Sequence, residues 1–125
     1  MTETKVLLYT RNKDVVAERL HNLISALVPE KNIEISRSIK RLSQSLGYSS
    51  TYNTLAVLLA SSEENLQELL AINDFLVNFR IILILPDDEK EMMAKGYRLY
   101  PRFVSNITSD FKDVGAVMKK ILKNI

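Results

Sequence analysis

The sequence has 125 residues, with 17 lysine and arginine residues, 15 aspartate and glutamate residues and no cysteine. Its length predicts one domain, spanning residues 1–125, with a sizeable buried core, and the lack of cysteine excludes disulfides, thiolate metal sites and thiol nucleophiles. A net charge of +2 does not by itself indicate a nucleic acid or an anionic membrane as a partner.

Two kinds of apolar pattern alternate along the chain. In chain order they predict a strand at 6–9, a helix at 16–27, a strand at 33–35, a helix at 39–46, a strand at 55–59, a helix at 66–77, a strand at 81–85, a helix through Met92 and Met93, a strand at 103–107 and a helix at 114–121. The helices repeat apolar residues three and four positions apart. The runs 6–9, 55–59 and 81–85 are continuously apolar, which is typical of strands covered on both faces, whereas the other two strands include polar residues, as edge strands do.

Several residues mark the expected helix ends. Gly47 is predicted to stop the second helix. Ser61 or Ser62 is predicted to cap the third helix, ahead of the acidic pair Glu63-Glu64. Asp110 is the expected cap of the last helix.

The strict alternation of strand and helix predicts a parallel sheet with helices on both faces. With 6–9, 55–59 and 81–85 in the centre, the fold is an α/β three-layer sandwich, flavodoxin-like, with strand order 2-1-3-4-5. In such a sheet, ligands bind beyond the carboxyl ends of the strands, near the switch between strands one and three.

The carboxyl ends of the strands form a rim along one edge of the sheet. The turn after the first strand, 10–14, contains no glycine, so the sequence does not predict a phosphate-binding loop of the dinucleotide or P-loop type. One hypothesis is a small-ligand sensor, for an anion or a nucleotide, or an unrecognised enzyme. Arg11 would then hold an anionic group, and the other rim candidates would be Ser61, Ser62, Asp87 and Asp88.

The acidic residues after the strands have two interpretations. Glu63, Glu64, Asp87, Asp88 and Asp110 could hold magnesium through oxygen ligands, or they could complement the dipoles of the helices that they precede. The second interpretation is favoured because helix position alone explains all five. The only histidine, His21, is expected to be a surface residue.

Several motifs, together with chain length and element order, resemble the receiver domains of two-component response regulators. The segment 80–85, the acids 87–89 and Lys95-Gly96 are similar to the fourth strand, acidic loop and fourth helix of a receiver. The segment 103–106, followed by Asp110-Phe111, resembles the fifth strand and the start of the final helix. The resemblance covers essentially the whole chain.

The resemblance implies that the phosphorylation residues are replaced. Thr10 and Arg11 stand where receivers place an acidic pair for magnesium, and Ala60 stands where they place the phosphoaccepting aspartate. Leu85 replaces the switch threonine or serine, and Asn106 replaces the lysine of strand five. Phosphoryl transfer to a carboxylate needs these groups, so we expect a non-catalytic pseudo-receiver without a cofactor.

Receivers usually signal through helix four, strand five and helix five. The corresponding candidate interaction surface is Tyr97, Arg98, Tyr100, Arg102 and Phe103, residue types that often anchor protein interfaces. The alternative, with equal weight, is that these aromatic residues only cover the edge of the sheet. The expected partner is a protein of bacterial signalling or a second copy of the chain.

Other classes of partner are not favoured. The basic clusters Arg37-Lys40-Arg41 and Lys119-Lys120-Lys123 lack interleaved aromatic residues, so nucleic acid binding is not expected. No apolar run approaches the roughly 18 residues of a membrane span, and residues 1–5 lack a signal-peptide pattern. We therefore expect a cytoplasmic protein with no membrane partner.

Overall fold

A computed structural model describes residues 4–123 of the chain. The elements, in chain order, are β1 (Lys5–Thr10), α1 (Val15–Ser25), the 3-10 turn η1 (Glu30–Asn32), β2 (Ile33–Ser36), α2 (Ile39–Tyr48), β3 (Thr54–Leu59), α3 (Glu63–Ala71), α4 (Asn73–Leu76), β4 (Arg80–Leu85), α5 (Lys90–Tyr97), β5 (Phe103–Asn106) and α6 (Lys112–Lys123). All neighbouring strands are parallel, in the order β2-β1-β3-β4-β5. The predicted flavodoxin-like architecture is confirmed.

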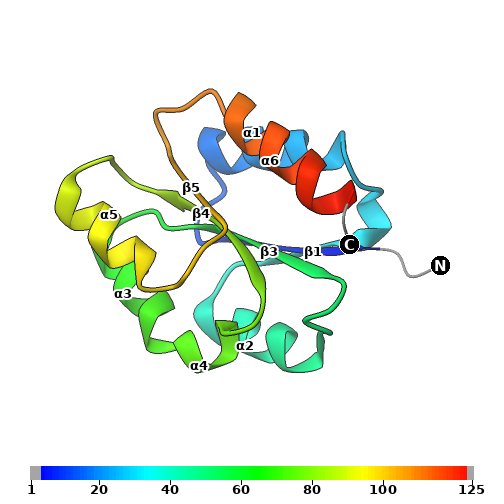
Figure 1. Cartoon of the computed structure of the whole chain (residues 1–125), viewed down its shortest axis with the longest axis horizontal. Coiled ribbons are helices and arrows are strands. Elements are labelled where there is room, and N and C mark those ends of the chain that lie inside the picture. The colour runs from blue at the N-terminus through cyan, green and yellow to red at the C-terminus, as the bar shows by residue number, and fades with distance from the viewer. Residues whose placement is uncertain (1–3, 124–125) are drawn as a thin grey trace.

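The helices form one layer on each face of the sheet (Figure 1). Successive strand residues point to opposite faces, so Leu7 and Tyr9 join the core under α2, α3, α4 and α5, whereas Val6 and Leu8 join the core under α1 and α6. All six residues of β3 are buried. This central position explains why β3 is a continuous apolar run.

The segment expected to form one helix at 66–77 is instead two helices. The backbone leaves the helical region at Ile72 (ψ 23°), where α3 ends, and α4 then begins at Asn73. The amide of Ile72 donates to the carbonyl of Leu69, and the amide of Phe75 donates to the carbonyl of Ile72. This tight turn redirects the chain so that Ile72 and Leu76 both reach the core, which a single straight axis need not allow.

The structure also tests the other predicted element ends. Gly47 does not stop α2, which continues to Tyr48. A terminal glycine acts through a left-handed backbone, and none of the three glycines, all within the described range, has a positive φ. Ser62, not Ser61, caps α3 by accepting from the amide of Asn65. The strand β5 ends at Asn106, one residue before the predicted end, because the chain turns there toward α6.

Asp110 lies in the loop before α6, where its carboxylate accepts from the amide of Lys112, the first residue of the helix. Of the helices in residues 4–123, none is both long and apolar enough to cross a membrane.

Candidate functional site

Two arginine side chains lie beside the carboxyl end of β1. Arg37, after β2, donates from Nη1 to the hydroxyl of the buried Thr10 at 2.6 Å and to the carbonyl of Asn12 at 3.2 Å. Arg11 is exposed and forms an ion pair of 3.0 Å with Glu68 on α3. The end of β1 therefore carries two guanidinium groups, one of which is paired with a carboxylate.

The residues at the carboxyl ends of β3, β4 and β5 have little reactive chemistry. Ala60 directly follows β3; it is fully buried and its amide donates to the carbonyl of Ile84 at 2.9 Å. Leu85 ends β4 and is fully buried in the core below α3 and α5. Asn106 ends β5, and its side-chain oxygen accepts from the amide of Thr108 at 3.0 Å. These side chains offer a methyl group, an isobutyl group and an amide.

The rim residues form local contacts rather than one shared site. Ser61 donates from its hydroxyl to the side-chain oxygen of Asn65, and Ser62 is the cap of α3. Asp87 accepts from the amide of Glu89, two residues along the chain, and Asp88 is exposed. Within residues 4–123, no hydrogen bond or ion pair joins Arg11 to either aspartate.

The acidic residues lie near helix starts, as the dipole interpretation expects. Glu63 and Glu64 are in the first turn of α3, and Glu63 pairs with Lys95 of α5. Asp87 and Asp88 precede α5, which begins at Lys90. Across the described part of the chain, no group of three or more histidine, aspartate and glutamate residues is arranged to hold a metal ion. His21, with its ring 31% exposed, lies 3.0 Å from a carboxylate oxygen of Glu30.

A buried polar network beneath the rim was not expected from the sequence. The side-chain nitrogen of Asn65 donates to the hydroxyl of Tyr9 at 2.7 Å and to Glu68 at 3.3 Å, and its oxygen accepts from the amide of Ser61. Burial raises the pKa of the Tyr9 hydroxyl, although the Asn65 hydrogen bond opposes this shift. Asn65 stands four residues before Leu69, on the apolar face of α3, and that position was the signal for a buried polar partner.

The segment between α5 and β5 presents the candidate interaction surface. Tyr97 and Tyr100 are 54% and 82% exposed, and Arg98 and Arg102 are also exposed. Phe103 is only partly buried and packs against the core under α1 and α6. In Figure 1, β5 lies at the edge of the sheet between α5 and α6.

Tyr100 has an unusual backbone at this exposed position. Its φ is 53°, in the left-handed region that favours glycine or asparagine. The residue is 82% exposed. Asn78 and Phe111 also have a positive φ, but Phe111 is buried in the core, whereas Tyr100 is exposed.

The comparisons with known proteins agree with this architecture. No family model and no curated protein sequence matches the chain. A solved signal receiver domain of an HD domain-containing protein from Pseudomonas fluorescens Pf-5 matches with a TM-score of 0.75 and 18% identity, over 98% of this chain and 88% of that one. The chain has the fold of a signal receiver domain.

A second solved structure has the same receiver-like fold. The N-terminal domain of an uncharacterized protein from Wolinella succinogenes matches with a TM-score of 0.66 and 15% identity, over 96% of this chain and 91% of that one. In this fold, Thr10, Leu85 and Asn106 are the last residues of β1, β4 and β5, and Ala60 directly follows β3.

Proposed function

We propose that this chain is a non-catalytic pseudo-receiver that binds a protein partner in bacterial signal transduction through Tyr97, Arg98, Tyr100, Arg102 and Phe103. The observation that carries the proposal is Tyr100, which holds a left-handed backbone while 82% of the residue is exposed. Tyrosine and arginine are enriched among the residues that dominate interface energetics. The exposed residues of this surface have the composition that a protein partner would use.

The proposed lack of phosphorylation rests on the residues at the strand ends. Ala60 supplies a buried methyl group where a phosphoacceptor needs a carboxylate. Arg11 and Arg37 bring positive charge to the end of β1, where a magnesium ion would need acidic ligands. These residues support a domain that works by binding rather than by a phosphorylation cycle.

The first experiment separates binding by the surface from chemistry at the rim. Amide NMR spectra are recorded for the labelled protein alone, with magnesium and beryllofluoride, and then with nucleotides and cyclic dinucleotides. We expect no shifts at the rim. Shifts confined to the loops around Arg11, Ser61 and Asp87 would overturn the proposal and support the small-ligand hypothesis instead.

The second experiment tests the surface itself. Immobilised wild-type protein and a Tyr100→Ala, Arg102→Ala double variant capture proteins from an extract of the source organism. Tyr48→Ala is the matched control, because Tyr48 is 92% exposed on α2, in the layer opposite α6. A protein retained by wild type and control but lost by the double variant is the expected result. Equal retention by all three would place the interface elsewhere.

A further inference from the structure

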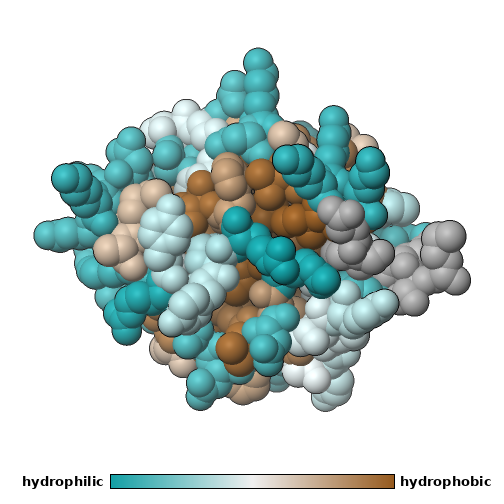
Figure 2. Space-filling model, in the orientation of Figure 1, coloured by the Kyte–Doolittle hydropathy of each residue, from teal (hydrophilic) through white to brown (hydrophobic). Residues whose placement is uncertain are grey.

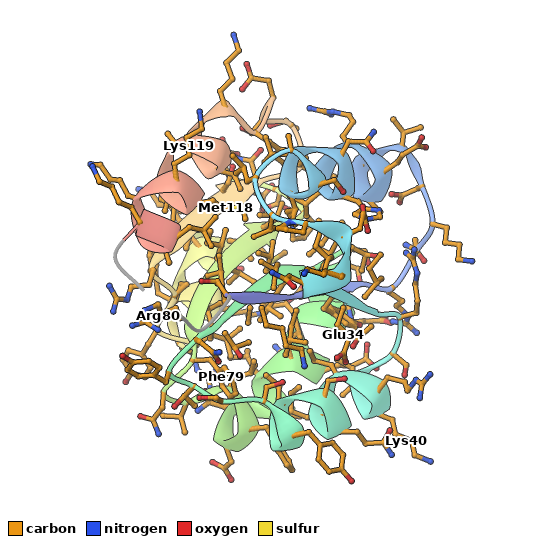
Figure 3. The ribbon with its side chains drawn as sticks, turned by 90° about the vertical axis from the view of Figure 1, so that its right-hand side faces the viewer. Glu34, Lys40, Phe79, Arg80, Met118 and Lys119 are labelled. Carbon is orange, nitrogen blue, oxygen red and sulfur yellow. The ribbon has the colours of Figure 1, made fainter. Side chains whose placement is uncertain are left out.

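A hollow of about 350 Å³ opens beside the proposed interaction surface. It lies where the amino-terminal ends of β4 and β5 meet α6, and we call it the basic hollow. Its lining consists of Arg80, Arg102, Val117, Lys120 and Ile121. In Figure 3, Arg80 lies below α6, the helix that carries the labelled Met118 and Lys119. Arg102 belongs both to this hollow and to the surface around Tyr100.

The charged residues among the described lining of the basic hollow all have the same sign. Three of its five lining residues are cationic, and none of the described residues that line it is acidic. Arg80 donates to the backbone carbonyls of Thr51 and Tyr52, which hold its guanidinium group in place without neutralising its charge. Within residues 4–123, the guanidinium of Arg102 has no hydrogen-bond or ion-pair partner.

Helix stability does not account for this arrangement. Lys120 and Lys123 lie in the last turn of α6, where cations complement the helix dipole. Arg80 begins β4 and Arg102 directly precedes β5, so neither gains from that dipole. The guanidinium groups of Arg80 and Arg102 line one hollow and repel each other, and an anionic ligand would relieve that repulsion.

The floor of the basic hollow is apolar. Val117 and Ile121 are one helical turn apart on α6, and both are only partly buried against the core below. Figure 2 shows a brown apolar area in the region where β5 and α6 meet, bordered by strongly hydrophilic side chains. The hollow therefore combines an apolar strip with a cationic border.

We propose that the basic hollow binds an acidic, amphipathic segment of the partner protein. The apolar side chains of this segment contact Val117 and Ile121. Its carboxylates pair with Arg80, Arg102 and Lys120. This inference rests on the proposed function, because it extends the surface that contains Tyr100 and Arg102. Charge complementarity selects the acidic partner, and the apolar floor selects a protein segment. None of the described residues that line the hollow has an aromatic ring on which a nucleic acid base could stack.

The test uses two synthetic amphipathic peptides, each of roughly four helical turns. One is built from leucine and glutamate, and the other has glutamine in place of each glutamate. We expect the acidic peptide to shift the amide signals of Arg102, Val117 and Ile121 and to bind about tenfold more weakly to an Arg80→Gln, Lys120→Gln variant. A Lys13→Gln, Lys40→Gln variant, which removes two exposed charges elsewhere, should bind like the wild type.

Other results would overturn the inference. Equal binding of the glutamine peptide would show that the charges do not contribute, and tighter binding of a single-stranded oligothymidine would indicate a nucleic acid site. Dimerisation that disappears in the Arg80→Gln, Lys120→Gln variant would make a second copy the occupant. Should the Arg80→Gln, Lys120→Gln variant not fold, Lys120→Glu alone replaces it and must show the same loss of acidic-peptide binding.

The capture experiment separates this inference from the proposed function. If the partner is lost by Tyr100→Ala, Arg102→Ala but retained by Arg80→Gln, Lys120→Gln, the proposed function stands and the basic hollow is not part of its interface. If the two double variants and the Tyr48→Ala control all retain the partner equally, the proposed function itself fails. Loss of the partner in both double variants, with the control intact, supports the proposed function, and it supports the basic hollow only together with selective binding of the acidic peptide.

Discussion

The hydroxyl group of Tyr9 accepts a 2.7 Å hydrogen bond from the side-chain nitrogen of Asn65, and both residues are fully buried. Tyr9 lies on β1 and Asn65 on α3, so this bond ties the first strand to the helix that follows the central strand. Asn65 also holds Ser61, directly after Ala60. Asn65 therefore links β1 to the backbone that follows β3 through hydrogen bonds below the rim.

Tyr9→Phe should lower the free energy of unfolding at neutral pH by about 1 to 3 kcal/mol, because a buried amide loses its nearest acceptor. The variant should also change the alkaline profile. A raised pKa means that the folded Tyr9 keeps its proton while the unfolded chain releases it, so wild-type stability should fall as the pH rises above the ordinary tyrosine pKa. Urea unfolding of both proteins, from neutral to alkaline pH, measures the two effects. A phenylalanine variant with the same alkaline loss would contradict the assignment to Tyr9.

Tyr100→Gly should remove the partner-binding ring without harming the fold. Glycine adopts the φ of 53° without the steric penalty that a side chain brings, so this variant should be more stable than Tyr100→Ala by about 1 kcal/mol. Both variants should lose the captured partner. Thermal unfolding of the two variants beside the wild type provides the stability comparison. A loss of more than about 2 kcal/mol in both would mean that the Tyr100 ring has a structural role.

Two glycines in helices should respond to alanine in opposite directions. At Gly96 a new Cβ would lie 3.0 Å from Cδ2 of Leu83, in the packed core under α5, so Gly96→Ala should destabilise the domain by about 1 to 3 kcal/mol. At Gly47 a Cβ meets nothing within 4 Å, so Gly47→Ala should stabilise α2 by about 0.5 to 1 kcal/mol. Chemical denaturation of both variants tests the pair, and the same sign of change in both would contradict the packing around Gly96.

Glu34 should make stability depend on acidic pH. The Ser45 hydroxyl, which donates to the carboxylate, and Lys5, 3.0 Å away, lower the pKa of Glu34 below its ordinary value. A lowered pKa stabilises the fold above the ordinary glutamate pKa, and this contribution is lost as the pH falls through the pKa of the folded state. Glu34→Gln should therefore be less stable than the wild type at neutral pH, and the difference should shrink below about pH 4.

Urea unfolding at a series of pH values measures this difference, with Ser45→Ala as the companion variant. The Ser45 hydroxyl is the main cause of the lowered pKa of Glu34. Ser45→Ala should therefore weaken the dependence of stability on acidic pH, as Glu34→Gln does. An unchanged acid profile in both variants would mean that other carboxyl groups dominate the loss of stability.

The sequence by itself determined the order of the elements and the order of the strands. Continuous apolar runs at β1, β3 and β4 and mixed edges at β2 and β5 depend only on local composition, because a strand covered on both faces has no polar side. The end of β4 at Leu85 matches the prediction for the same reason, whereas the predicted strands at 6–9 and 103–107 end one residue before Thr10 and one residue after Asn106. Local pattern also placed Tyr97 and Tyr100 on an exposed segment before the last strand.

Only the tertiary structure decided which polar groups meet. Tyr9 and Asn65 are 56 positions apart along the chain, and Arg11 and Glu68 are 57 apart, so no periodicity links them. The left-handed backbone of Tyr100 likewise follows from how the chain turns into β5. The basic hollow exists because β4, β5 and α6 pack side by side, and that packing brings Arg80 and Arg102 next to Ile121. Side chains distant in sequence become a site only when the sheet fixes their positions.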